Sequence, residues 1–401
     1  PDELAGLVRG LSLKQVSVLQ AVGVPIMERM IEIKPRKAEL VAGRRGLVRA
    51  YVKPAANWRA RAVRGRLTIR YGQAALVSTT VYEQTLFVDR ASSDEDPLST
   101  LNFEVPAEAV DVSTHYSIEL LETETCTEED GDVENARFPA DDSLALGVVE
   151  GHTLRVRIVP VELHVSGQVF LPDVSPEQLE LLRREVVKFF PVRDVELSVR
   201  DSALSSTAID MVSVFDEVAA LRDEENTDPG LSYYGLVRFG ADIVSYCSPS
   251  CVLGASAIGE APGGGTAVGV GYTGSKAAVT FAHELGHVYG RPHSPCGVAG
   301  DPQFPYAGGG IGAWGYDVVE QALVDPAQHR DFMGYCTPTW VSDHTYEHLR
   351  QFIEAVPARP SPAARLAAGR AGRAPAASLR SPRYRADLAA RRGRVVLCGE
   401  P

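Results

Sequence analysis

The chain has 401 residues, of which 45% are hydrophobic and 23% are charged, a composition typical of a globular protein long enough for two domains. Its formal net charge of −12 argues against nucleic acid as the main partner, because proteins that bind nucleic acid present a basic face. The sequence contains neither the run of roughly eighteen apolar residues that a membrane-spanning helix needs nor a signal peptide. We therefore expect no transmembrane segment and a natural start upstream of Pro1.

Residues 1–150 are predicted to form an all-β, sandwich-like accessory domain. The first 25 residues are mostly apolar and are expected to be helical or irregular. Apolar and polar residues then alternate in short stretches separated by Gly, Pro and Asp turns, as in antiparallel strands. These stretches are residues 39–52, 62–70, 77–89, 101–105 and 115–121. No catalytic constellation occurs here, so the domain is either a substrate-docking or latency module or a support for the rest of the chain.

An acidic segment, residues 126–142, closes this first region. Its carboxylates are Glu128, Glu129, Asp130, Asp132 and Glu134. Clustered carboxylates suit Ca²⁺, but their spacing does not match the EF-hand pattern. The sequence leaves open a calcium-binding loop or a solvated acidic loop.

Residues 151–356 are predicted to form a second, α/β domain. Strands are expected at 153–160, 195–199, 231–239, 247–258 and 266–272, and helices at 175–190, 207–222 and 346–355. The first of these helices has Ser175 as N-cap, Pro176 at the first helical position and Gln178 three residues after the cap. Strands that alternate with helices predict a mixed, mainly parallel sheet backed by helices.

Residues 357–401 differ in composition from everything before them. Pro, Ala, Arg, Gly and Ser dominate up to Arg394, and Asp387 is the only acid in that stretch. This composition is typical of a linker or a surface tail, and its arginines leave open an anchor for an acidic polymer. Residues 395–398 are predicted to form one strand, either as part of the tail or as the start of a further domain cut off at Pro401.

One segment of the second domain carries the pattern H-E-x-x-H-x-x-G-x-x-H. His283 and His287 are four residues apart, so on a helix they share one face and can bind one metal ion. Glu284 lies one step round the helix, where it can hold a water molecule. Gly290 allows the left-handed conformation that ends the helix, and the turn brings in His293 as a third ligand. Three nitrogens and a water describe a catalytic zinc site, whereas buried structural histidines would leave Glu284 and Gly290 unexplained.

This motif resembles that of the metzincin zinc peptidases. The later segment Asp331-Phe-Met333-Gly-Tyr335-Cys336 resembles the methionine turn that lies under the metal in that clan. A Tyr two residues after the Met resembles the astacin and serralysin branches, although the Ser after His293 is a matrixin feature. Together with the residues that follow, including Trp340, the pattern most resembles bacterial secreted peptidases of the M66 (StcE-like) type.

The resemblance implies a secreted zinc endopeptidase. Glu284 would act as general base, Tyr335 would ligate zinc or steady the oxyanion, and Met333 would lie beneath the histidines. The fold implied is a metzincin-like catalytic domain with a mixed sheet, a zinc helix and a methionine turn. In that clan, an antiparallel edge strand before the zinc helix pairs with the substrate backbone, and Val252–Ile258 is the candidate strand here.

Other consequences follow from the same resemblance. Trp340 would help to line a substrate pocket, and mucin-like glycoproteins join other proteins as expected substrates. A catalytically silent adhesin with the same fold is the alternative from another class, against which an intact Glu284 argues. A zinc hydrolase acting on a non-peptide amide is the second alternative.

The chain has six cysteines and no C-x-x-C pair, so disulfides in an oxidising compartment are expected rather than a second metal site. The cysteines are Cys126, Cys247, Cys251, Cys296, Cys336 and Cys398. Under the metzincin resemblance, Cys296–Cys336 would tie the third-ligand segment to the methionine turn. Cys247–Cys251 is a candidate local bridge, and Cys126–Cys398 is left by elimination. Free buried thiols are the alternative.

Overall fold

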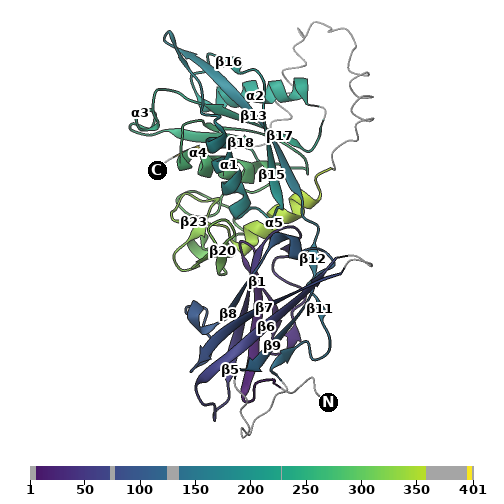
Figure 1. The fold of residues 1–401 in the computed structure, drawn as a ribbon. Helices are drawn as coiled ribbons and strands as arrows, with labels where there is room; N and C mark the ends of the chain where they lie inside the picture. Colours follow the sequence, from purple (N-terminus) through teal and green to yellow (C-terminus); the bar gives the residue numbers. More distant parts are fainter. Residues whose placement is uncertain (1–5, 73–76, 124–134, 227, 358–394, 400–401) are drawn as a thin grey trace.

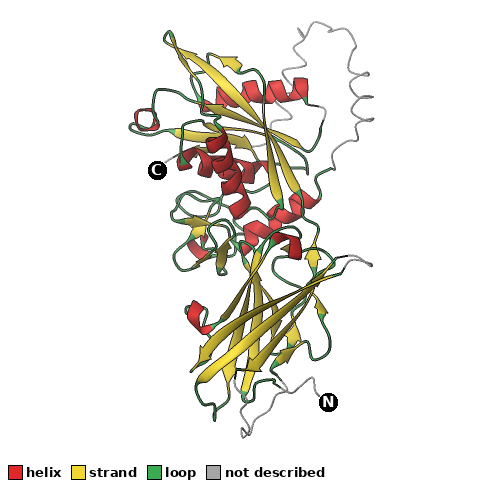
Figure 2. Cartoon of the chain, viewed as in Figure 1, coloured by secondary structure: helices red, strands yellow, loops and turns green. Residues whose placement is uncertain are grey.

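The computed structural model describes residues 6–72, 77–123, 135–226, 228–357 and 395–399. Two lobes follow one another along the molecule, an all-β lobe that begins the chain and a mixed α/β lobe (Figure 1). The change from one to the other falls between β12 (Val148–Val149) and β13 (Thr153–Val165). Colouring by secondary structure separates the lobes clearly, since the α-helices gather in the second (Figure 2).

The first lobe consists mainly of two antiparallel sheets that share one hydrophobic core. Their strand orders are β3-β2-β1-β5-β8 and β10-β9-β6-β7, with β11 also pairing with β9. The strands are β1 Leu11–Leu19, β2 Gly23–Glu28, β3 Ile31–Glu32, β4 Leu40–Val41, β5 Gly46–Pro54, β6 Arg61–Tyr71, β7 Ser78–Val88, β8 Leu101–Val105, β9 His115–Glu122, β10 Arg137–Phe138 and β11 Leu144–Ala145. Two short 3₁₀ helices, η1 (Pro97–Ser99) and η2 (Ala107–Ala109), flank β8, and β12 pairs in parallel with β4.

The expectation for the first 25 residues was wrong, because β1 and β2 are strands. The reason is a bulge in β1, where the register against β5 shifts between Leu13 and Gln15. The buried residues Leu11, Leu13, Val16 and Val18 are therefore not evenly two apart. An extra residue in a strand interrupts the two-residue alternation by which strands are recognised.

The second lobe is built on a mixed sheet with the order β14-β13-β17-β19-β18-β24, and β15 and β16 also pair with β13. The strands after β13 are β14 Gln168–Phe170, β15 Asp194–Val199, β16 Leu204–Ser206, β17 Leu231–Val237, β18 Val252–Ala257, β19 Thr266–Val270 and β24 Val395–Gly399. β13, β17 and β19 run parallel, and β18 runs antiparallel to β19. The mixed sheet agrees with the expected architecture.

Helices cover both faces of this sheet. The helices of this lobe are α1 Pro176–Phe189, α2 Met211–Glu225, α3 Ile243–Tyr246, α4 Ser275–Val288 and α5 Asp343–Glu354. Helix α2 packs on one face of the sheet, and α1 and α4 pack on the other. Successive residues of a strand point to opposite faces. Accordingly, Tyr233 of β17 belongs to the core under α2, whereas Tyr234 belongs to the core that contains α1 and α4. Tyr234 lies edge-on to Phe281 of α4, with ring centroids 4.5 Å apart.

Capping residues explain where the helices begin. Ser175 accepts a hydrogen bond from the backbone N–H of Gln178, and Pro176 is the first residue of α1, as expected. Helix α2 begins after Asp210 and therefore later than expected, since that carboxylate accepts from the N–H of Ser213. Helix α5 begins after Ser342, earlier than expected.

The segment between α4 and α5 contains short elements that pack against the first lobe. They are η3 Ala307–Gly309, β20 Gly315–Asp317, β21 Ala322–Val324, β22 Arg330–Asp331 and β23 Thr339–Trp340. The backbone N–H of Gly23 donates to Trp314 and that of Tyr316 donates to Ala21. The buried Arg44 side chain of the first lobe also donates to the carbonyl oxygens of Lys188, in the last turn of α1, and of Val192, just after it. These contacts join the two lobes around the short elements.

The strand expected at residues 395–398 is present as β24, which pairs antiparallel with β18 and is the last described strand of the sheet. The expectation that Val252–Ile258 forms an edge strand was therefore wrong, because β24 covers the outer side of β18. The possible calcium carboxylates at 128–134 and the Arg-rich stretch 358–394 lie outside the described residues. Among the described helices, none has the length and apolar character to cross a membrane.

Candidate metal and catalytic site

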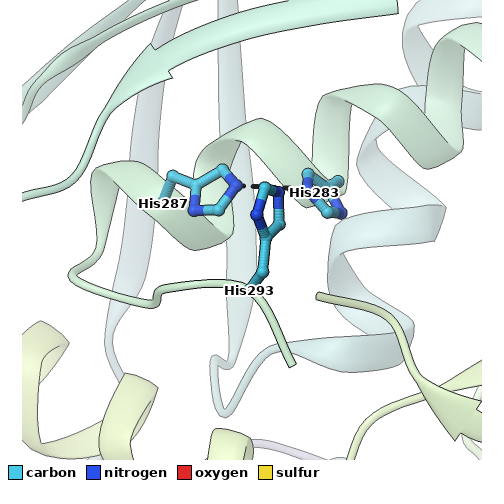
Figure 3. Close-up of side chains that lie close together, drawn as sticks. All are labelled: His283, His287 and His293. Atoms are coloured by element: carbon cyan, nitrogen blue, oxygen red, sulfur yellow. Dashed lines mark hydrogen bonds between the residues drawn. The ribbon is translucent and has the colours of Figure 1, made fainter. Parts of the chain in front are cut away.

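Helix α4 and the turn after it bring His283, His287 and His293 together (Figure 3). Their ligand nitrogens all lie within 4.8 Å of one another. Gly290 has a φ of 84°, the left-handed conformation that the motif predicts for the residue ending the helix. The chain then reverses, and the backbone N–H of Arg291 donates to the carbonyl oxygen of Gly286. The sequence spacing therefore placed all three histidines correctly.

The hydrogen bonds of two of these histidines fix which nitrogens face the centre of the cluster. The Nδ1 atoms of His283 and His287 lie 2.8 Å and 2.5 Å from the carbonyl oxygens of Phe332 and Arg291. A carbonyl oxygen only accepts, so each Nδ1 carries the proton and each Nε2 presents a lone pair. The two Nε2 atoms are 3.1 Å apart (Figure 3). Two lone pairs this close repel unless a cation lies between them, and nitrogens on one tetrahedral zinc are about 3.3 Å apart.

Burial keeps His283 and His287 neutral. The exposed fractions of His283, His287 and His293 are 4%, 0% and 9%. Burial lowers the pKa of His283 to about 4, and burial together with the neighbouring imidazoles lowers the pKa of His287 well below its ordinary value. Because metals bind the neutral imidazole, the site does not have to lose protons near neutral pH before a metal binds. The donor set and its protonation both fit zinc.

Glu284 faces β18. Its side chain is fully buried, and Ser256 of β18 donates a hydrogen bond of 2.5 Å to its Oε2. Gly254 makes room for the carboxylate, because a Cβ there would lie only 2.5 Å from Oε1. Burial raises the pKa of Glu284 to about 8, against the opposing effect of the Ser256 hydrogen bond. A carboxyl group with a pKa near neutrality can accept a proton and return it.

Sequence reasoning missed Gly254 and Ser256. The only signal was a pair of small residues at alternate positions of a strand, which places them on one face. Nothing local shows that a carboxylate 28 residues later covers that face. Their role follows from the packing of α4 on β18.

Met333 lies against α4. A Cβ at Gly286 would be 2.3 Å from the Met333 sulfur, so only glycine allows the thioether to approach the helix this closely. Asp331, which is fully buried, accepts hydrogen bonds of 2.9 Å from the backbone N–H groups of Met333 and Ser342. The Asp331 carboxylate thus fixes the turn that carries the methionine.

Tyr335 lies beside the histidine cluster. Its ring centroid is 5.0 Å from that of His293, at an interplanar angle of 73°, and 6.0 Å from that of His283. The ring is half-buried. Its backbone N–H donates to the carbonyl oxygen of Cys296, and Cys296 is joined to Cys336 by a disulfide. The third-ligand segment and the methionine segment therefore run side by side next to the cluster.

Both of the first two expected disulfides, Cys296–Cys336 and Cys247–Cys251, are present. Cys247–Cys251 lies directly before β18. The third expected pair stays a prediction, because Cys126 lies outside the described residues. Both observed bridges flank the histidine cluster in sequence, one on the β18 side and one on the methionine side.

Trp340 does not join the site. Its side chain is 5% exposed, its Nε1 donates to the carbonyl oxygen of Ala21 at 2.8 Å, and its ring meets Phe189 edge-on. Trp340 belongs to the contact between the lobes, so the expectation that it lines a substrate pocket was wrong. The sequence does not distinguish an aromatic residue facing a cleft from one facing a neighbouring lobe. Val252 and Ile258 are half-buried, at the start of β18 and just after its end.

Comparison with known proteins agrees with the motif. Residues 240–342 match the family model of peptidase M66, a segment that includes β18, β19, α4 and all three histidines. The expected resemblance to M66 peptidases is thereby confirmed. No curated protein matches the chain.

A solved structure was also found, a cycloisomaltooligosaccharide glucanotransferase of Paenibacillus sp. complexed with cycloisomaltoheptaose. It is 13% identical, and the alignment covers 56% of this chain and 28% of that one. Its TM-score of 0.18 is too low for any conclusion about fold or function.

Proposed function

From the M66 peptidase segment at residues 240–342, we propose that the chain is a zinc-dependent endopeptidase of metzincin type. The observation that carries the proposal is the pair of Nε2 lone pairs directed at each other 3.1 Å apart on a helix that also holds a buried carboxylate. This arrangement has a use in metal-assisted hydrolysis and is costly without a cation. A binding-only protein would have no need for the carboxylate.

His283, His287 and His293 would hold the zinc through one nitrogen each. Zinc bound by three histidines lowers the pKa of a water molecule toward 7 and polarises a carbonyl group. The carbonyl oxygens that accept from the Nδ1 atoms of His283 and His287 orient these rings and make them better ligands.

Glu284 would accept the proton of the attacking water and pass it to the leaving amine. Burial raises its pKa above the ordinary value, which makes the carboxylate a stronger base. Ser256 holds Oε2, so Oε1 remains the oxygen available to the water. Among the described residues, Oε1 has no hydrogen-bond partner, which fits a group whose partner is a reactant.

Tyr335 would donate to the oxyanion that forms as the peptide carbonyl is attacked. Its place beside His293 brings the phenol to the cluster from a different element than Glu284. Met333 would support the histidine rings by its packing against Gly286. The substrate would be an extended segment of a protein or glycoprotein, with Val252 and Ile258 near the two ends of the strand that it follows.

The enzyme is proposed to act outside the cytoplasm, because its two disulfides persist in oxidising compartments. The test is incubation of the full chain with casein and, in parallel, with mucin. Cleavage that stops with a metal chelator and returns on addition of zinc is the expected result. Cleavage at the same rate in the presence of the chelator would contradict zinc dependence. Binding of casein or mucin without cleavage would favour an adhesin.

A further inference from the structure

The outer edge of β18 is occupied by β24, a later strand of the same chain. Val395–Gly399 pairs antiparallel with β18, in a register that sets Gly254 opposite Cys398 and Ala255 opposite Leu397. No other described strand lies beyond β24 in the sheet. The pairing joins β18 and β24, which are separated in sequence by the rest of the second lobe and by residues 358–394, a stretch rich in Pro, Ala and Arg.

This edge is the one next to the catalytic carboxylate. Gly254, at the centre of the paired stretch, is in direct contact with Glu284, and Ser256, two residues on, donates to the same carboxylate. A chain paired with β18 from outside therefore runs alongside the group that would take the proton of the attacking water. An extended peptide gains main-chain hydrogen bonds in such a position.

We propose that Val395–Gly399 is an autoinhibitory strand that occupies the main-chain binding site of the substrate. The proposal rests on the proposed function, since it assigns the substrate to the outer edge of β18. A substrate and β24 would form the same kind of antiparallel ladder with the same strand, so only one of them can be paired with it at a time. The intact chain is then a slow peptidase whose substrate has to displace β24.

The sequence of β24 suits a displaceable occupant. Val395, Val396 and Leu397 favour extended structure, and Gly399 adds no side chain to the ladder. The strand is tethered to the catalytic lobe through residues 358–394, so its pairing is intramolecular. Tethering raises the effective concentration of a segment at its binding site above that of a free peptide in solution. A substrate present at micromolar concentration would compete poorly until the strand is released.

The first test uses the full chain with Val396→Pro and Leu397→Pro together. Successive N–H groups of a strand point to opposite sides, so two adjacent prolines remove one ladder hydrogen bond whichever of them faces β18. The matched control carries Ala376→Pro and Ala377→Pro, in the stretch before β24. With casein or an unstructured peptide as substrate, the Val396/Leu397 variant should show a KM at least about 10-fold lower and an unchanged kcat, because a competitor has been removed. Equal KM values in the variant, the control and the unmodified chain would overturn the proposal.

A second variant avoids any effect of the prolines on folding. A recognition site for a specific protease is inserted between Ala376 and Ala377, and the tether is cut after the protein has folded. The strand then becomes a dilutable inhibitor, so kcat/KM should rise on dilution and fall again when a synthetic peptide of residues 394–401 is added. An unchanged kcat/KM after cutting and dilution would show that β24 is a permanent strand of the sheet.

A binding measurement separates this proposal from the proposed activity. The labelled peptide 394–401 should bind the Val396/Leu397 variant and not the intact chain, whether or not either protein cleaves casein. Binding of the peptide without cleavage by any variant would reject the peptidase and keep the displaceable strand. If all forms cleave casein at the same rate and none binds the peptide, the peptidase activity stands and the autoinhibitory role of β24 is rejected.

Discussion

The two sides of helix α4 are held in different ways. On the side of Met333, the neighbouring segment is fixed by the buried Asp331 carboxylate, by the Cys296–Cys336 disulfide and by contacts with the first lobe. On the side of Glu284, the cover is β18, whose outer neighbour β24 is attached by strand pairing and by a long connection. On the proposed function this difference is useful, since metal ligands would need a fixed geometry and a substrate-binding edge would have to exchange its occupant.

The largest effect should come from Glu284→Gln, which keeps the shape of the side chain and removes its basicity. Turnover of casein is expected to fall by about 10²- to 10⁴-fold, the usual contribution of a general base. Zinc content should stay the same, because the three histidines are intact, and elemental analysis of the same preparation checks this. Turnover near that of the unmodified chain would mean that the base is another group.

On the Met333 side of α4, replacing both Cys296 and Cys336 with serine removes the disulfide that fixes the segment. This bridge closes 40 residues, and its loss should lower the free energy of unfolding by about 4 kcal/mol in the chain-entropy model. The control pair, Cys247→Ser with Cys251→Ser, opens a bridge across only 4 residues, and a loss of about 2 kcal/mol is expected. Denaturant unfolding measures both. Equal losses would contradict the chain-entropy estimate for the Cys296–Cys336 bridge.

The variant Tyr335→Phe tests whether the Tyr335 hydroxyl takes part in the reaction or stabilises the turn. If it donates to the oxyanion, kcat should fall by about 10²-fold with little change in Tm. If it serves the turn, stability should fall by about 1 kcal/mol and kcat should not change. Tyr316→Phe is the control, since its hydroxyl donates to Glu104 in the contact between the lobes. Loss of kcat in the control as well would remove the argument for Tyr335.

The smallest effect is expected from Ser256→Ala on the β18 side. Loss of one hydrogen bond to Glu284 should lower kcat/KM by roughly 3- to 10-fold, since such a bond contributes about 1 kcal/mol. Ser232→Ala is the control, because this buried strand serine bonds to Tyr289 instead of the carboxylate. A loss confined to Ser256→Ala supports its role in positioning Glu284. Equal effects of the two variants would point to strand packing alone.

The sequence specified the parts of the site that are local. The spacing of His283, His287, Gly290 and His293 follows from helix geometry and from one left-handed residue, so it can be predicted without the fold. The cap at Ser175 and the alternation of strands and helices are local in the same sense. Strand β1 was not predicted because its bulge interrupts the alternation of apolar and polar residues.

What the sequence could not supply are contacts between distant segments. The burial of Trp340 against Ala21 and the hydrogen bond from Ser256 to Glu284 depend on how lobes and layers pack. The pairing of β24 with β18 rests on main-chain N–H and C=O groups, and every residue except proline carries both. No side-chain pattern therefore marks which strand edge a given segment will choose.

The proposed activity depends most on a metal held by the three histidines. Its most direct test is casein hydrolysis measured while zinc is returned stepwise to metal-depleted protein. We predict that activity rises in proportion to added zinc and reaches its plateau at one zinc per chain, and that His287→Ala regains no activity in the same titration. Full activity in the metal-depleted protein, or the same plateau in His287→Ala, would contradict it.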